Sequence, residues 1–217
     1  MKRHVIFLTT LILISSFSFA QRFKAGLFAG ISTSQVHGDT YSGFNKAGLF
    51  AGATLAKKFS EESKWESSFE ISYIQKGSTK LANPSKGDYK SYYLSLDYAE
   101  VPALLRYHFS VADTTRSFSS SFFIEGGLSF GALVNQKEAD ENGIISGGIP
   151  FEKYDISTVF GLSYSLRKNI SFNIRTINSF LPVRKFNIPI YYPRWFLNLF
   201  NRGYYNNVLA LSLRYQF

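Results

Sequence analysis

Cysteine is absent from the 217 residues of the chain, and histidine occurs only three times. The first absence excludes disulfides and thiolate chemistry. No group of His, Asp and Glu has the spacing of a metal site. The nearest approach to a catalytic set, His37 with Ser34 and Asp39, is explained better by solvated loop polarity than by an activated nucleophile. We therefore expect no enzyme activity, no metal and no cofactor.

Long apolar runs are absent after residue 20, so no later segment is predicted to cross a membrane as a helix, which takes about 20 apolar residues. The one earlier run, residues 5–14, follows Lys2 and Arg3 and leads into Ser18-Phe19-Ala20. This order is typical of a cleaved secretory signal. We expect residues 1–20 to be a signal peptide and residues 21–217 to form a single domain.

Basic residues outnumber acidic ones but form no basic tract. The expected domain keeps 22 Lys and Arg against 15 Asp and Glu, a net charge of +7, because residues 1–20 hold two basic residues and no acid. Scattered basic residues do not indicate nucleic-acid binding. We expect them to be solvated, to pair inside the protein or to contact anionic lipid.

The C-terminal residues, 206–217, carry a large apolar side chain at every second position from Leu209 to Phe217. Leu213, Tyr215 and Phe217 lie on the apolar face, whereas Ser212 and Arg214 lie on the other. A strand with one apolar face and a terminal aromatic is typical of a transmembrane β-barrel whose apolar side meets lipid.

Eight such strands are predicted, at residues 22–32, 47–59, 64–76, 91–109, 119–134, 152–167, 170–180 and 206–217. Short connections, such as residues 60–63 and 168–169, alternate with long ones, of which residues 181–205 are the longest. Outer-membrane barrels place short turns in the periplasm and long loops outside. We therefore predict an all-β fold, an eight-stranded antiparallel transmembrane barrel of up-and-down topology, in the outer membrane with both termini periplasmic.

Charged residues within these strands share their face with Gly, Ser and Asn. This pattern predicts a polar interior and an apolar exterior, the reverse of a lipocalin-like barrel. Opposite charges on neighbouring strands should then meet in an interior ionic network, formed by Glu70, Glu100, Arg106, Glu125, Asp155, Arg175 and Arg214. A proton or ion path is the alternative, but eight strands leave an interior that side chains can fill. Pro102 lies inside a predicted strand and removes a ladder donor, so we expect a bulge there.

Three fragments resemble the PorT-like outer-membrane β-barrel proteins of Bacteroidota. Tyr98-Ala99-Glu100-Val101-Pro102 is similar to the family's Tyr-x-Glu-Ile/Val-Pro strand, residues 73–77 to its Tyr-x-x-Lys-Gly strand end, and residues 126–131 to its Gly-rich fifth strand. The resemblance implies an eight-stranded outer-membrane barrel, and some family members are associated with protein export or gliding machinery. It also implies that Leu213, Tyr215 and Phe217 form a C-terminal insertion signal for the barrel-assembly machinery.

The fourth long loop is basic and aromatic and carries no acid between residues 181 and 205. A proline near the start and a glycine near the end of residues 193–203 favour a short helix. We expect an interaction surface formed by Arg194, Trp195, Phe196, Phe200 and Arg202. A lipid anchor, a plug over the barrel mouth and a site for an envelope protein partner remain open as its use.

Together these features predict a non-enzymatic integral membrane barrel that contacts outer-membrane lipid and presents loops for interaction or supports an envelope or secretion assembly. The alternatives are a narrow porin-like channel for small solutes and, with fewer supporting residues, a lipid-acting barrel enzyme.

Overall fold

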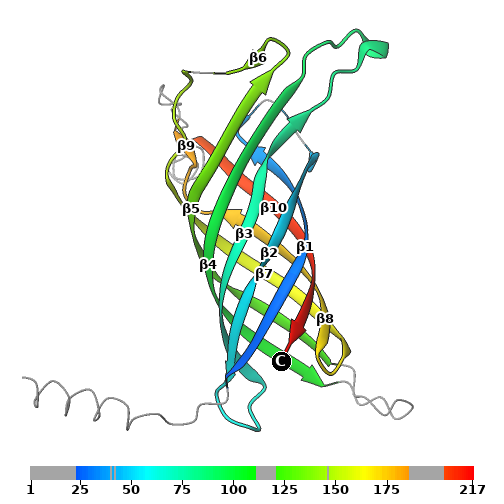
Figure 1. Ribbon diagram of the computed structural model, residues 1–217, viewed down its shortest axis with the longest axis vertical. Helices are drawn as coiled ribbons and strands as arrows, with labels where there is room; N and C mark the ends of the chain where they lie inside the picture. The colour runs from blue at the N-terminus through cyan, green and yellow to red at the C-terminus, as the bar shows by residue number, and fades with distance from the viewer. Residues whose placement is uncertain (1–22, 40, 42, 111–120, 146, 186–202) are drawn as a thin grey trace, which may run out of the picture.

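Eight long antiparallel strands close into a barrel in the computed structural model, which describes residues 23–39, 41, 43–110, 121–145, 147–185 and 203–217 (Figure 1). The strands are β1 (Lys24–His37), β2 (Lys46–Lys58), β3 (Trp65–Lys80), β4 (Tyr92–Ser110), β5 (Ser121–Asp140), β7 (Tyr154–Arg167), β8 (Ile170–Ser179) and β10 (Gly203–Gln216). Three short elements join them: β6 (Gly143–Ile144), β9 (Arg184–Lys185) and the 3-10 helix η1 (Pro84–Lys86).

Strand β1 closes the barrel because it pairs with β2 on one side and with β10 on the other. The β1–β10 ladder runs from the Gly26–Gln216 pair to the His37–Tyr205 pair. Each of the eight long strands therefore has a neighbour on both sides, which removes the exposed edges of an open sheet. The predicted fold class and up-and-down order are confirmed.

The distribution of burial is the reverse of that in a soluble barrel. On β3, Glu70 is 1% exposed, whereas its neighbour Ile71 is 70% exposed. The same alternation places Phe160 outside and Gly161 inside on β7. Because side chains alternate across a strand, the polar set fills the interior and the apolar set forms an outer belt.

The strands extend further than predicted at the end of the barrel opposite the chain termini. β1 continues to His37, β3 to Lys80 and β5 to Asp140, and β10 already begins at Gly203. Residues in these extensions are mostly polar, so the apolar alternation used for the prediction stops before the backbone pairing does. β3, β4 and β5 extend together at this end, where Tyr92 pairs with both Lys80 and Asp140, and β6 lies at the tip of β5 (Figure 1).

Pro102 does not produce the predicted bulge. It pairs with Ser129 on β5 in regular register, and on its other side the β3–β4 pairing lapses only between the Phe69–Ala103 and Ser72–Glu100 pairs. The register shift of this hairpin lies instead between Asp97 and Tyr98. The missing proline N–H is thus accommodated by a local gap in the β3–β4 pairing, and the register on both sides of the gap is the same.

Candidate functional site: the barrel interior

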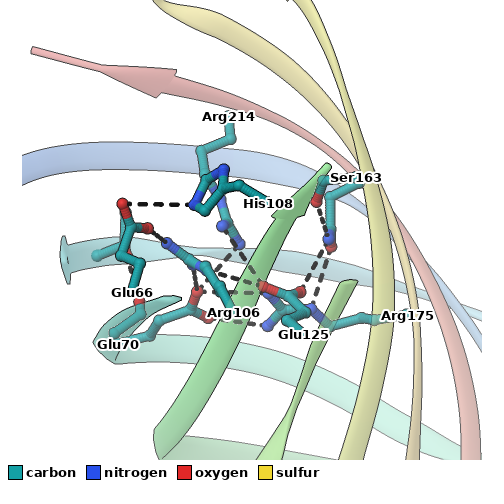
Figure 2. Close-up of polar contacts among 11 residues, drawn as sticks. Glu66, Glu70, Arg106, His108, Glu125, Ser163, Arg175 and Arg214 are labelled. Atoms are coloured by element: carbon teal, nitrogen blue, oxygen red, sulfur yellow. Dashed lines mark hydrogen bonds and ion pairs between the residues drawn. The ribbon is translucent and has the colours of Figure 1, made fainter. Parts of the chain in front are cut away.

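Three arginines and three glutamates meet inside the barrel, and all six side chains are buried (Figure 2). The six residues are Glu66 and Glu70 from β3, Arg106 from β4, Glu125 from β5, Arg175 from β8 and Arg214 from β10. Each occupies the inward position of its strand, which is why residues so distant in sequence converge. We refer to these six residues as the central cluster.

Arg106 binds one carboxylate with each of its three guanidinium nitrogens. Its Nε donates to Glu125 Oε2 at 3.0 Å, its Nη1 to Glu66 Oε1 at 3.1 Å and its Nη2 to Glu70 Oε1 at 2.8 Å. The planar guanidinium thereby fixes three carboxylates from β3 and β5 in one layer.

Arg175 approaches the same carboxylates from the opposite wall. Its Nη1 donates to Glu70 Oε2 at 2.8 Å and its Nη2 to Glu125 Oε1 at 2.6 Å. Its Nε donates to Asn173 Oδ1, and the Asn173 amide in turn donates to Glu125 and to Ser163. The guanidinium lies 5.4 Å from the ring centre of Phe50, close enough for a cation–π contact.

Arg214 is less completely bonded than the other two arginines. Its Nη2 donates to Glu70 Oε1 at 3.0 Å, and its Nη1 lies 3.6 Å from Glu125 Oε2 without hydrogen-bond geometry. Its Nε and Nη1 have no hydrogen-bond partner among the described residues. The guanidinium of Arg214 therefore retains donor capacity.

A second ionic cluster surrounds Lys76. Its Nζ lies 2.6 Å from Glu100 Oε1 and 3.0 Å from Asp155 Oδ2. Ser129 donates to Glu100, and Ser157 and Ser179 donate to Asp155. One ammonium and three hydroxyls thus contact the two buried carboxylates, although Glu100 Oε1 and Asp155 Oδ1 have no hydrogen-bond partner among the described residues.

The seven network residues expected from the sequence therefore divide between two clusters. Glu70, Arg106, Glu125, Arg175 and Arg214 lie in the central cluster, whereas Glu100 and Asp155 lie around Lys76. The cation that pairs with Glu100 is Lys76, which the predicted network does not contain.

Two members of these clusters, Glu66 and Lys76, were not included in the predicted network. Both occupy even positions of β3, as Glu70 does, so extending the alternation along the whole strand would have identified them. Lys76 was instead interpreted as part of a strand end, although β3 continues to Lys80.

Gly161 provides the space for the Glu125–Arg175 pair. A Cβ atom at this position would lie 2.7 Å from Glu125 Oε1 and 3.1 Å from Arg175 Cβ. Neither group can withdraw freely, because both are held by several hydrogen bonds. Glycine is therefore required at position 161, because Glu125 and Arg175 approach its backbone too closely for a side chain to fit.

Apolar and ionic contacts close the interior at the end opposite the chain termini. Phe151 and Val183, from the β6–β7 and β8–β9 connections, are buried within the same apolar cluster as Leu94 and Leu96 of β4. The Arg184 guanidinium lies 3.6 Å from the ring centre of Phe151 and forms two hydrogen bonds with Glu138. The β6–β7 connection and the β8–β9 segment are thereby held in contact at the mouth of the barrel.

The remaining residues singled out in the sequence lie elsewhere. Leu213, Tyr215 and Phe217 face outward and are 56%, 47% and 69% exposed. The proposed loop surface of Arg194, Trp195, Phe196, Phe200 and Arg202 lies outside the described residues, as does the expected signal peptide. In the described parts of the chain, no helix is long and apolar enough to span a membrane, and no three His, Cys, Asp or Glu side chains could hold a metal ion.

Comparison with known proteins identifies a family and several similar structures. A family model for an outer membrane protein beta-barrel domain matches residues 18–183. Ail, the attachment invasion locus protein of Yersinia pestis, is 14% identical with a TM-score of 0.47, over 89% of this chain and 98% of that one. Neisserial surface protein A is 12% identical with a TM-score of 0.45, over 90% of this chain and 97% of that one. OprG from Pseudomonas aeruginosa is 13% identical with a TM-score of 0.41, over 91% of this chain and 97% of that one. Curated protein sequences give no match. The family match spans strands β1 to β8.

Proposed function

The chain belongs to the outer membrane protein β-barrel domain family, and from this premise we propose that it is a non-enzymatic barrel of PorT-like type that binds an envelope protein partner through its extended end. In this proposal both termini lie in the periplasm, residues 1–20 are removed on export, and β4, β5 and the long connections project outside the cell.

The observation that carries the proposal is the occupied interior. The central cluster and the Lys76 cluster fill the barrel with bonded side chains, and Phe151 and Val183 close one mouth. Transport through such an interior would require several buried ion pairs to separate, each leaving charge without a partner. The proposed partner is therefore expected to bind outside this packed interior.

The extended end offers an apolar surface suited to a protein partner. Leu81, Tyr89 and Ile144 are 80%, 71% and 72% exposed on the β3–β4 connection and on β6. They lie beyond the paired strands of the outer belt, so lipid contact does not explain them. Apolar side chains on projecting connections are accessible to a partner, and Tyr is among the residues enriched in protein interfaces.

The PorT-like assignment is supported by an ion pair of the Lys76 cluster that joins β3 to β4. Glu100 of the Tyr-x-Glu-Val-Pro segment binds Lys76, which belongs to the Tyr-x-x-Lys-Gly segment. The two segments through which the sequence resembles that family are therefore joined by one ion pair inside the barrel.

Crosslinking and affinity purification from intact outer membranes test the proposal. We expect wild type to capture a specific envelope protein, and the triple variant Leu81→Ser/Tyr89→Ser/Ile144→Ser to fold but lose it. Lys86→Ser/Lys90→Ser, on the same β3–β4 connection, is the matched control and should retain the partner. The variant Arg194→Ser/Trp195→Ser/Phe196→Ser tests the fourth loop in the same way.

Two results would contradict the proposal. Retention of all partners by both triple variants would mean that the extended end is not the interaction surface. A stable ionic conductance of the purified protein in planar bilayers would show that the interior opens, and would favour the porin-like alternative.

A further inference from the structure

A basic cavity lies at the end of the barrel that carries both chain termini. Its volume is about 200 Å³, and it lies between the β7–β8 turn, the start of β1, the ends of β2 and β10, and the central cluster. Six cationic side chains line it: Lys24, Lys58, Arg106, Arg167, Lys168 and Arg214. Glu66 is the one carboxylate of its lining, among the described residues. We call this cavity the basic vestibule.

The lining of the vestibule carries more positive than negative charge. The central cluster balances three arginines against three glutamates, so Arg106, Arg214 and Glu66 are already accounted for within it. Lys24, Lys58, Arg167 and Lys168 then add four positive charges at the mouth, where the described lining holds no further carboxylate. An anion is the ligand whose binding such a field favours.

The inner wall of the vestibule holds hydrogen-bond donors that are not used. Arg214 is 3% exposed and lines the cavity, yet its Nε and Nη1 have no hydrogen-bond partner in the described structure. His108 also lines the cavity, and its Nε2 lies 3.6 Å from Glu66 Oε2, so only Arg214 brings unused donors to this wall in the described structure. Buried donors without partners are costly, and a bound acceptor would remove that cost.

The mouth of the vestibule is held in position before any ligand arrives. Asn169, in the turn that carries Lys168, donates from its side chain to Gln216 O at 2.7 Å, and Gln216 N donates to Asn169 O at 2.8 Å. These bonds tie the β7–β8 turn to the end of β10, so that Arg167 and Lys168 stay beside the cavity. Preorganisation of this kind lowers the entropy cost of binding.

We propose that the basic vestibule binds a phosphoryl group. A phosphate monoester or free phosphate carries a charge of about −1.5 to −2 at neutral pH and offers three acceptor oxygens, so it can engage several cations at once. A single carboxylate offers two oxygens and one charge, which suits this number of donors less well. The cavity is smaller than the roughly 300 Å³ at which pockets for drug-sized ligands begin, which favours a compact group.

Calorimetric titration of the folded full-length mature protein in a nonionic detergent tests this assignment. One arm uses inorganic phosphate, and the other uses glycerol 3-phosphate, a phosphate monoester that is the headgroup of phosphatidic acid without its acyl chains. We expect saturable binding at one site in at least one arm, with chloride at equal ionic strength producing none. Tighter binding of the first ligand would identify a free phosphate as the source, and of the second a lipid headgroup.

Two charge-matched variants locate the site. Arg167→Gln/Lys168→Gln removes two cations from the vestibule without touching the Asn169 bonds, and should weaken binding at least tenfold. Lys86→Gln/Lys137→Gln removes two exposed cations at the opposite end and should leave affinity unchanged. Backbone amide shifts on titration should concentrate at residues 167–171 and around Arg214. Absence of saturable binding in both arms, or equal weakening by the two variants, would overturn the proposal.

Discussion

Arg175 donates to Glu125 across 2.6 Å at the centre of the barrel, in the space left by the missing side chain of Gly161. The pair joins β8 to β5, strands separated by β7 in the sheet. An inward glycine on the intervening strand is therefore what allows two charged groups to meet across it.

We predict that Gly161→Ala destabilises the barrel by about 1–3 kcal/mol, because the added methyl group overpacks Glu125 and Arg175. Gly126→Ala is the matched control, since its Cβ would meet nothing closer than the Phe160 ring at 3.6 Å. The control should be neutral or slightly stabilising. Unfolding free energies in lipid vesicles measure both, and equal values for the two variants would contradict the close-approach argument.

Removing Glu100 should destabilise the protein by about 3–5 kcal/mol, because Lys76 would lose one of its two buried carboxylate partners. The comparison is Glu152→Ala, which breaks the exposed Lys185–Glu152 pair and should change stability by less than about 1 kcal/mol. Denaturant titration in detergent gives both values. A change near zero for Glu100→Ala would mean that water reaches Lys76.

Outward aromatics at the C-terminus should act during insertion and contribute little to the finished fold. The variant Tyr215→Ser/Phe217→Ser keeps the backbone bond from Phe217 N to Ala25 O at 2.9 Å. We expect strongly reduced heat-modifiable barrel in cells but near-normal folding into vesicles from denaturant. Phe180→Ser, an exposed aromatic at the opposite end, should insert normally. Normal cellular levels of the double variant would rule out the insertion signal.

The protein should fractionate with the outer membrane and begin at Gln21 after removal of residues 1–20. The outer belt requires detergent for extraction, because large apolar side chains such as Ile71 and Phe160 are exposed on it. Membrane fractionation followed by N-terminal sequencing provides the measurement. Mature protein recovered from the soluble periplasm without detergent would be incompatible with this prediction.

The closure of the mouth by Arg184 should depend on pH. Glu138 lies where β5 continues beyond its pairing with β7. Burial alone would raise the pKa of Glu138. Hydrogen bonds from Arg184 and Tyr92 outweigh burial and lower this pKa below its usual value of 4.5. Because the folded-state pKa is depressed, this stabilisation is present above the usual pKa and is lost as pH falls through the lowered one. The protection factor of the Val183 amide, whose N–H donates to Tyr204 O, should fall on acidification. In Glu138→Gln that pH dependence should be absent.

Side-chain alternation in the sequence predicted the barrel and the orientation of its strands because the period of two is a local property. It placed Glu70 inside and Ile71 outside, as observed. The same signal fails where a strand leaves the apolar belt, which is why the continuation of β5 to Asp140 was missed.

Pairing between charged residues could not be predicted in the same way, because it depends on the stagger of strands around the barrel. Glu100 and Arg106 share a face of β4, yet they belong to different clusters. Which carboxylate meets which cation is determined by register, and one register shift, between Asp97 and Tyr98, lies close to Glu100.

The position of Arg214 on the last strand has a consequence for the order of folding. Before β10 joins β1, the three carboxylates of the central cluster face only Arg106 and Arg175, and the missing cation lies 144 residues beyond Glu70 in sequence. Contacts of such separation form late, because a long loop must close first. The third negative charge of the central cluster is then neutralised when β10 pairs with β1 and closes the barrel. A half-closed intermediate therefore carries an electrostatic penalty that the closed barrel does not.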